Sequence, residues 1–382
     1  MKKTLLACAF LSLIWVIGRG ASAQEKVVLE KVPGGGIQPQ AVTDSGGTIH
    51  LIYFKGKAAA GDVYYVRRKA GEKAFSRPLR VNSLRGSVMA VGSVRGAHLA
   101  VGKGGRIHVA WMGSEAAKDS QGRLPMLYTR LNDQGTSFER ERNLIQSAYG
   151  LDGGGSVAAD GAGNVYVAWH ADAGAGEESK RRVWLARSED DGKTFLKETA
   201  VDAKGDGACG CCGLKVMTDR RNGVYLLYRT AKEGRQRDMT LLYSGTKGNG
   251  FKSLPVDAWE LESCPMTTPN MVPLEEGVLG AWETKGRVLF STFSPDGMKR
   301  KLFSAPGEGE NSKHPRLAKN AQGQVLLAWT EGASWGKGGS LAWQVFDQEG
   351  RPTRGRGRME EGVPAWSFAS VVGTPQGFLL FY

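Results

Sequence analysis

The stretch Ser188-Glu189-Asp190-Asp191-Gly192-Lys193-Thr194-Phe195 has the composition of a tight turn between two β-strands. Short polar side chains such as those of Ser188 and Asp190 form hydrogen bonds with the backbone of a turn, and Gly192 tolerates the positive φ that hairpins need. The ring of Phe195 can pack beneath such a turn. The stretch therefore predicts a hairpin in an antiparallel sheet.

A near-copy of this turn occupies residues 132–138, with the sequence Asn-Asp-Gln-Gly-Thr-Ser-Phe. The matching positions are Asp133, Gly135, Ser137 and Phe138, and Leu131 stands where the first serine would be. Both turns lie between the third and fourth strand-like runs of a larger repeated unit. The turn is therefore one part of a repeat that extends along the chain.

The repeated unit has a short strand, a turn with glycine, and a second strand that ends in an aromatic residue. Runs of four to eight residues rich in Val, Leu, Tyr and Trp, bounded by Gly, Asp and Asn, are typical of β-strands. Two further strand-like runs follow each of the first six second strands. The second strands are predicted at 48–53, 106–111, 164–169, 223–228, 277–282, 324–329 and 377–382.

Four strands per unit of about 50 residues, repeated six or seven times, predict an all-β chain folded as a β-propeller. The final unit has only its first two strands, and a strand at 26–32 can complete it and remove an exposed sheet edge. We favour seven blades, with six as the alternative. Residues 24–382 then form a single domain.

The turns at 188–195 and 132–138 resemble the Asp-box, or BNR repeat, of sialidase-like β-propellers. In that superfamily the box is a structural turn on the face away from the site. The resemblance covers essentially the whole chain after residue 23. It implies that ligands bind on the face built from the loops that enter each innermost strand and those that leave each second strand.

Residues 1–23 read as a signal peptide, with Lys2 and Lys3 before an apolar run and Ala21-Ser22-Ala23 as a cleavage site. We therefore expect an exported protein, periplasmic or extracellular, with no membrane-spanning segment. The net charge is +13 for the whole chain. It becomes 48 minus 38, or +10, once Lys2, Lys3 and Arg19 are removed.

The resemblance places a set of polar and sulfur-bearing residues on the ligand face. Loops that enter adjacent blades converge near the axis, so Cys264 is expected to approach the three cysteines of the fourth unit. The set comprises Cys209, Cys211 and Cys212 before the fourth unit, Cys264 and Met266 before the fifth, His314 and Arg316 before the sixth, and His170, Arg229, Arg237 and Glu283 at or beyond the ends of second strands.

Three interpretations of the four cysteines remain open. An oxidising compartment favours disulfides, for example between Cys264 and one member of the cluster. A bridge between Cys209 and Cys212 would close a very small loop and add little stability. The same thiols, with Met266, form a soft ligand set that suits copper(I), or zinc(II) through thiolates. A labile short-loop disulfide acting in thiol exchange is the third interpretation.

Catalytic sialidases carry an Arg-Ile-Pro motif near the first blade, and here residues 36–40 read Gly-Ile-Gln-Pro-Gln. Arg229, Arg316 and Glu283 are the weak catalytic candidates, and no tyrosine nucleophile can be placed. We therefore expect a binding or accessory role. The alternative is an exo-sialidase or related glycoside hydrolase with a non-standard active site.

The positive charge is spread over loops of different blades, for example 180–182 and 351–358, with little aromatic interleaving. Such runs are typical of a solvated surface, and with export also predicted we expect no nucleic-acid partner. We expect a small-molecule, glycan or metal ligand on the propeller face, and a monomer. A scaffold for a protein partner is the remaining possibility.

Overall fold

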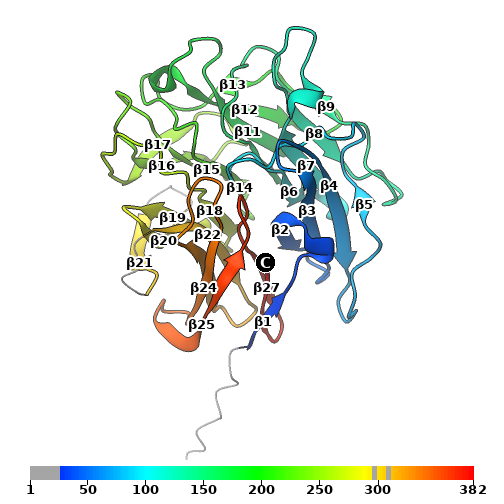
Figure 1. Cartoon of the computed structure of the whole chain (residues 1–382), viewed down its shortest axis with the longest axis vertical. Coiled ribbons are helices and arrows are strands. Elements are labelled where there is room, and N and C mark those ends of the chain that lie inside the picture. The colour runs from blue at the N-terminus through cyan, green and yellow to red at the C-terminus, as the bar shows by residue number, and fades with distance from the viewer. Residues whose placement is uncertain (1–25, 295–298, 307–310) are drawn as a thin grey trace, which may run out of the picture.

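The computed structural model describes residues 26–294, 299–306 and 311–382, so the predicted signal peptide at 1–23 lies outside the described residues. The described chain forms sheets arranged as blades in a ring (Figure 1). Six sheets have four antiparallel strands in chain order. They are β2 (Ile37–Thr43), β3 (Ile49–Lys57), β4 (Ala60–Arg68) and β5 (Leu79–Arg80); β6 (His98–Val101), β7 (Ile107–Met112), β8 (Met126–Arg130) and β9 (Arg142–Asn143); β10 (Ser156–Ala159), β11 (Val165–Ala171), β12 (Arg182–Ser188) and β13 (Thr199–Ala200); β14 (Lys215–Thr218), β15 (Val224–Arg229), β16 (Met239–Ser244) and β17 (Lys252–Asp257); β18 (Asn270–Pro273), β19 (Val278–Thr284), β20 (Arg287–Phe293) and β21 (Lys299–Ser304); and β22 (Ser312–Lys319), β23 (Val325–Glu331), β24 (Gly339–Phe346) and β25 (Pro352–Val363).

The seventh sheet joins the two ends of the described chain. It contains β26 (Ser370–Thr374), β27 (Gly377–Phe381) and β1 (Lys26–Glu30), and β1 pairs in parallel with β27. The Val32 N–H donates to the Tyr382 carbonyl at 2.9 Å, which extends the junction beyond the strands. In Figure 1 the blue β1 lies beside the red β27. Seven blades, closed by the predicted N-terminal strand, are therefore confirmed.

The second strands form where the apolar runs predicted them, each beginning within one residue of the predicted start. Their side chains pack between neighbouring blades, so that one apolar cluster fills each of the seven gaps. Trp111, Trp169 and Trp282 at the strand ends are fully buried. Burying a large apolar side chain contributes roughly 1.5–3 kcal/mol, so these contacts hold the ring together.

The turn after β12 has the hydrogen bonds that its sequence predicts. The Asp190 carboxylate accepts from the Thr194 N–H at 2.9 Å and from the Ser188 and Thr194 hydroxyls, each at 2.7 Å. Gly192 has φ 75°. The Asp191 N–H donates to the Gly163 carbonyl at 2.8 Å, which places this turn on the same face as the hairpin between β10 and β11.

The near-copy after β8 makes its bonds one residue earlier than the sequence alignment indicates. Asn132, rather than Asp133, accepts from the Thr136 N–H at 2.9 Å and donates to the Ser137 hydroxyl at 2.9 Å. Asp133 instead pairs with Arg106 at 2.5 Å, and Arg106 also binds Asp191 of the neighbouring blade. This face of the ring is thus joined by ion pairs between blades.

Helical structure in the described residues is limited to single 3-10 turns. None of the helices among these residues has the length and apolar character needed to cross a membrane. The turns are η1 (Pro33–Gly35), η2 (Lys103–Gly105), η3 (Glu115–Ala117) and η4 (Glu178–Lys180).

Candidate functional site

The loop that enters β14 folds three cysteines into one turn. The Cys212 N–H donates to the Cys209 carbonyl at 3.2 Å, so the first and last residues of the turn lie side by side. The Sγ atom of Cys209 lies 3.1 Å from Sγ of Cys212 and 3.3 Å from Sγ of Cys211. Cys209 and Cys212 are buried, Cys211 is half-buried, and all four cysteines of the described chain are free thiols.

The three sulfur atoms are close enough to share one ion, because all lie within 4.8 Å of one another. A bond of about 2.3 Å from zinc to sulfur separates tetrahedral ligands by roughly 3.8 Å, so only a small spreading of the sulfurs is needed. No disulfide joins any of the four cysteines among the described residues, and the pairing of the thiols stays a prediction.

The cluster favours one thiolate, at Cys212. Contacts with the thiols of Cys211 and Cys212, together with burial, raise the pKa of Cys209 far above its ordinary range. Burial opposes ionisation of Cys212, but hydrogen bonds from Cys209 and Cys211 and the positive charge of Arg229 outweigh it, so the pKa of Cys212 is well below its ordinary range.

Residues outside the turn hold it in place. The Cys209 N–H donates to the Arg229 carbonyl at 3.0 Å, at the end of β15. The Gly210 N–H donates to a carboxylate oxygen of Glu178 at 2.9 Å, and the other oxygen of Glu178 lies 2.8 Å from the Arg237 guanidinium. A Cβ at Gly210 would lie 2.3 Å from Asp152, so only glycine fits there without a shift of its neighbours. The turn is therefore preorganised by contacts from several loops.

The loop that carries the fourth cysteine is attached to this turn. The Gly213 N–H donates to the Thr267 carbonyl at 2.9 Å, and Lys313 Nζ donates to the Pro265 carbonyl at 2.6 Å. Cys264 is exposed and lies close enough to Cys211 to affect the pKa of that thiol. The predicted convergence of the loops entering β14 and β18 is therefore present.

Two of the basic residues predicted on the ligand face donate hydrogen bonds to backbone carbonyls instead of facing an open ligand site. The Arg229 guanidinium donates to the Arg237 carbonyl at 2.5 Å and to the Glu283 carbonyl, and it stacks on Trp259 at 4.8 Å. The Arg237 side chain pairs with Glu178 and donates to the Gly234 carbonyl at 2.9 Å. Both guanidinium groups lie near the sulfur cluster, since the charge of each interacts with the thiols of the cluster.

The two predicted histidines are buried, and one ring nitrogen of each already has a partner in the protein. His170 at the end of β11 donates from Nε2 to the Cys212 carbonyl at 2.9 Å, because a carbonyl can only accept. His314 lies in a bulge of β22 with φ 53°, and its Nδ1 is 3.3 Å from the Thr268 hydroxyl. Burial, with the charges of Arg316 and Lys313, lowers the pKa of His314 to about 3. His314 also lines a small recess with Met266.

Glu283 at the end of β19 is the predicted acid that the structure perturbs most. Burial raises its pKa to about 7 against the opposing charge of Arg229. One carboxylate oxygen accepts from the Gly286 N–H at 2.7 Å, and the other has no partner. Its pKa also responds to Cys212, which places it near the cluster.

Arg316 does not lie with the residues around the cysteine cluster. It lies on the inner strand β22, lines the central channel, and stacks on Phe368 at 3.9 Å. Several residues around the cluster were missed from sequence, among them Glu178, Arg181, Asp152 and Lys313. Each reaches the cluster through a side chain from another loop, which no local pattern signals.

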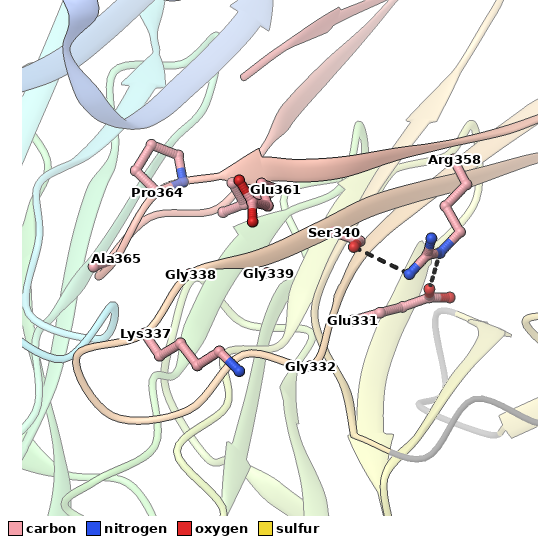
Figure 2. Close-up of a pocket in the computed structure, with 11 residues that line it drawn as sticks. Glu331, Gly332, Lys337, Gly338, Gly339, Ser340, Arg358, Glu361, Pro364 and Ala365 are labelled. Atoms are coloured by element: carbon pink, nitrogen blue, oxygen red, sulfur yellow. Dashed lines mark hydrogen bonds and ion pairs between the residues drawn. The ribbon is translucent and has the colours of Figure 1, made fainter.

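A separate surface recess of about 650 Å3 lies on the sixth blade, between the β23–β24 connection and the end of β25. Figure 2 shows Arg358 beside Glu331 and Ser340, to which it donates at 2.7 and 3.0 Å. None of the residues that line this recess belongs to the predicted ligand set. The recess is therefore not evidence for a ligand at the cysteine cluster.

Comparison with known proteins gives matches at the level of structure. No protein-family model and no curated protein sequence matches the chain. A protein of unknown function from Dyadobacter fermentans superposes with a TM-score of 0.55 and 16% identity over 85% of this chain and 98% of that one. An α-L-arabinanase from Penicillium chrysogenum gives 0.53 and 12% over 84% and 95%, and a Hadza microbial sialidase gives 0.53 and 13% over 82% and 66%.

The chain has the sialidase-like β-propeller fold. Within this β-propeller, the cysteine turn lies in the loop that enters β14, on the face opposite the turns at 188–195 and 132–138. The identities are low, so the likeness establishes the fold and leaves the chemistry to the residues themselves.

Proposed function

We propose that the chain is an exported β-propeller with a metal-binding role, whose ligand face takes copper(I) through Cys209, Cys211 and Cys212. The observation that carries the proposal is the convergence of three free thiols in one anchored turn. The signal-like segment 1–23 supports export. Copper or zinc acquired on the ligand face is then the cofactor or cargo of the protein.

The ligand chemistry favours copper(I) over zinc. Thiol and thioether ligands select copper(I), whereas zinc also accepts imidazole and prefers four ligands in a closed tetrahedron. Nε2 of His170 already binds a backbone carbonyl, and His314 contacts Thr268. The fourth thiol, at Cys264, is exposed rather than enclosed with the other three.

The surroundings suit a site that carries negative charge. Metal binding requires deprotonated thiols, so a copper(I) ion with two or three thiolates is anionic. Arg229 and Arg237 both lie close enough to interact with the cysteines, and Arg229, which has no ion pair among the described residues, supplies the compensating charge, whereas Arg237 already pairs with Glu178. The exposed Cys264 gives an incoming ion a first ligand at the surface.

A competition titration tests this proposal. Reduced protein comprising residues 24–382 is titrated with copper(I) against bicinchoninate, and we expect one ion per chain. Cys209→Ser and Cys212→Ser should each lose this binding. Met266→Leu is compared with Met271→Leu, a change at a buried methionine in the apolar core; weaker binding in the first variant alone would make Met266 a ligand.

Two results would overturn the copper proposal. One is removal of all copper by bicinchoninate from the wild-type protein. The other is stoichiometric binding that Cys212→Ser leaves unchanged. Tighter zinc binding that depends on all four cysteines would assign the site to zinc.

A glycoside hydrolase role is the second candidate, and Glu283 is the observation that favours it. A buried carboxyl with a pKa near 7 and one unpartnered oxygen has the properties of a general acid. Arabino-oligosaccharides and a fluorogenic sialoside are the substrates to test. Turnover that Glu283→Ala abolishes and Glu331→Ala preserves would support this role, and no turnover would remove it.

A further inference from the structure

The central channel contains a second group of buried charges, separate from the cysteines. The inner strands of all seven blades surround a channel of about 390 Å3. Its wall runs from Lys215 and Arg316 to Arg220 and Lys319, which lie at or beyond the ends of β14 and β22. The hairpins that follow these inner strands lie on the Asp-box face, so the channel extends toward the face opposite the cysteine turn.

The wall of the channel carries positive charge, and among the described residues only one of its four cations, Arg220, has an acidic partner, Glu275 at 2.7 Å. Of the described residues that line it, four are Lys or Arg and none is Asp or Glu. Lys215 is 6% exposed and Arg316 is 4% exposed. A buried cation without a partner is costly, since its lost hydration is not replaced. Two such cations in one channel point to a ligand that supplies the missing negative charge.

Arg316 is oriented by the protein but retains free donors. Its Nη1 donates to the Thr268 hydroxyl at 3.2 Å and to the Pro315 carbonyl at 2.8 Å. Its guanidinium stacks on Phe368, whereas Nε is buried and has no partner. The aromatic ring and the two hydrogen bonds fix the guanidinium plane without neutralising its charge.

The Lys215 ammonium group has no hydrogen bond or ion pair with any of the described residues, although the residue is more than nine-tenths buried. Burial and the nearby charge of Arg316 lower its pKa to about 8, and burial lowers the pKa of Arg316 to about 9. Both shifts reflect positive charges held out of water without a counterion. They agree with the geometry of the channel wall.

We propose that the central channel binds a small tetrahedral oxyanion, of the phosphate or sulfate class, between Lys215 and Arg316. A guanidinium offers paired donors to such an anion, and the ammonium group adds a point charge with three donors. The anion enters from the Asp-box face, past Arg220 and Lys319. The inference stands apart from the proposed metal site, since it rests on residues of the inner strands.

Calorimetry and thermal unfolding in phosphate-free and sulfate-free buffer test this proposal on metal-free protein comprising residues 24–382. Potassium phosphate should bind once per chain and raise the unfolding temperature saturably, relative to potassium chloride of equal ionic strength. Lys215→Met should weaken phosphate binding at least tenfold. It should also unfold at a higher temperature than the wild type in chloride, because the unpaired charge is gone.

Lys252→Met, at an exposed lysine of β17, is the matched control and should bind phosphate as the wild type does. Arg316→Lys keeps the charge but loses the paired donors, and should weaken binding severalfold even if Lys215→Met does not fold. Equal stabilisation of all variants by phosphate, or none beyond chloride in the wild type, would overturn the proposal. So would tighter binding of succinate than of phosphate or sulfate.

Discussion

The Gly213 N–H donates a hydrogen bond of 2.9 Å to the Thr267 carbonyl, and this bond joins the loops that carry the four cysteines. The two loops enter β14 and β18 of neighbouring blades, so the fourth thiol approaches the other three only when these two blades pack together. A Cβ at Gly213 would lie 2.7 Å from the Thr268 side chain. Because glycine has no side chain, the two loops can approach closely at this point. The four thiols are therefore positioned by packing between blades.

Gly210→Ala should weaken metal binding at least tenfold while the fold remains intact. The added methyl group meets the Asp152 carboxylate and lies 2.6 Å from the Arg181 guanidinium, so these two side chains must move away from the cysteine turn that they adjoin. Gly161→Ala, in an open turn with nothing within 4 Å, is the matched control. The copper(I) titration measures both variants, and equal affinity for the two would contradict the claim that the turn is preorganised.

Asp190→Ala should lower the free energy of unfolding by about 1–3 kcal/mol, because three donors of the turn lose their acceptor. Copper(I) affinity should not change, since this turn lies on the face away from the cysteines. Asp347→Ala removes a comparable exposed turn carboxylate on the sixth blade and tests whether the effect is general. Urea unfolding measures the loss, and a loss of metal binding in Asp190→Ala would contradict the separation of the two faces.

The contribution of Asp202 to the free energy of unfolding should fall as the pH rises from about 4 to about 6. Burial raises the pKa of Asp202 to about 6, against the opposing charge of Arg182. The folded state therefore holds this proton at a pH where the unfolded state has released it, and stability is lost as the pH rises through the folded pKa. A shift of this size corresponds to roughly 3 kcal/mol at most.

Asp202→Asn should remove this contribution, so the difference in unfolding temperature between the variant and the wild type should grow from pH 4 to pH 7. The variant should match the wild type near pH 4 and unfold at a higher temperature at pH 7. Asp206→Asn, four residues later and less buried, is the control. An identical pH profile for wild type and Asp202→Asn would show that Asp202 does not titrate in this range.

Removal of residues 24–30 should destabilise the ring by at least about 3 kcal/mol. The deletion exposes the edge of β27 and removes five backbone pairings together with the apolar contacts of Val27 and Leu29. A chain that begins at Lys26 keeps β1 and should keep full stability. Equal unfolding temperatures for the two truncated chains would contradict closure by the N-terminal strand.

The architecture could be predicted from the sequence because each blade repeats a local pattern. Apolar runs that end at Trp111, Trp169 and Trp282 mark strands by periodicity alone, and the turn at Ser188 fixes their order within a blade. In the near-copy at 132–138, the sequence did not indicate that Asn132 replaces Asp133 as the hydrogen-bond acceptor of the turn. It depends on Arg106, which draws Asp133 away from the turn.

The candidate site could be predicted only in part. The cysteines stood out because three lie within four residues, but Glu178 and Lys313 reach the loops around them from elsewhere in the ring. Lys215 and Arg316 lie about 100 residues apart in the sequence, and only ring closure brings them to one channel. Contacts of this kind follow from the packing of blades rather than from a motif.

X-ray absorption at the copper edge tests the central claim most directly, on reduced protein loaded with one equivalent of copper(I). Two or three sulfur ligands at about 2.3 Å, with no nitrogen or oxygen neighbour, are the predicted first shell. Cys209→Ser should lose this shell, and Met271→Leu should keep it. A first shell of nitrogen or oxygen, or copper that does not remain with the wild-type protein, would contradict the account.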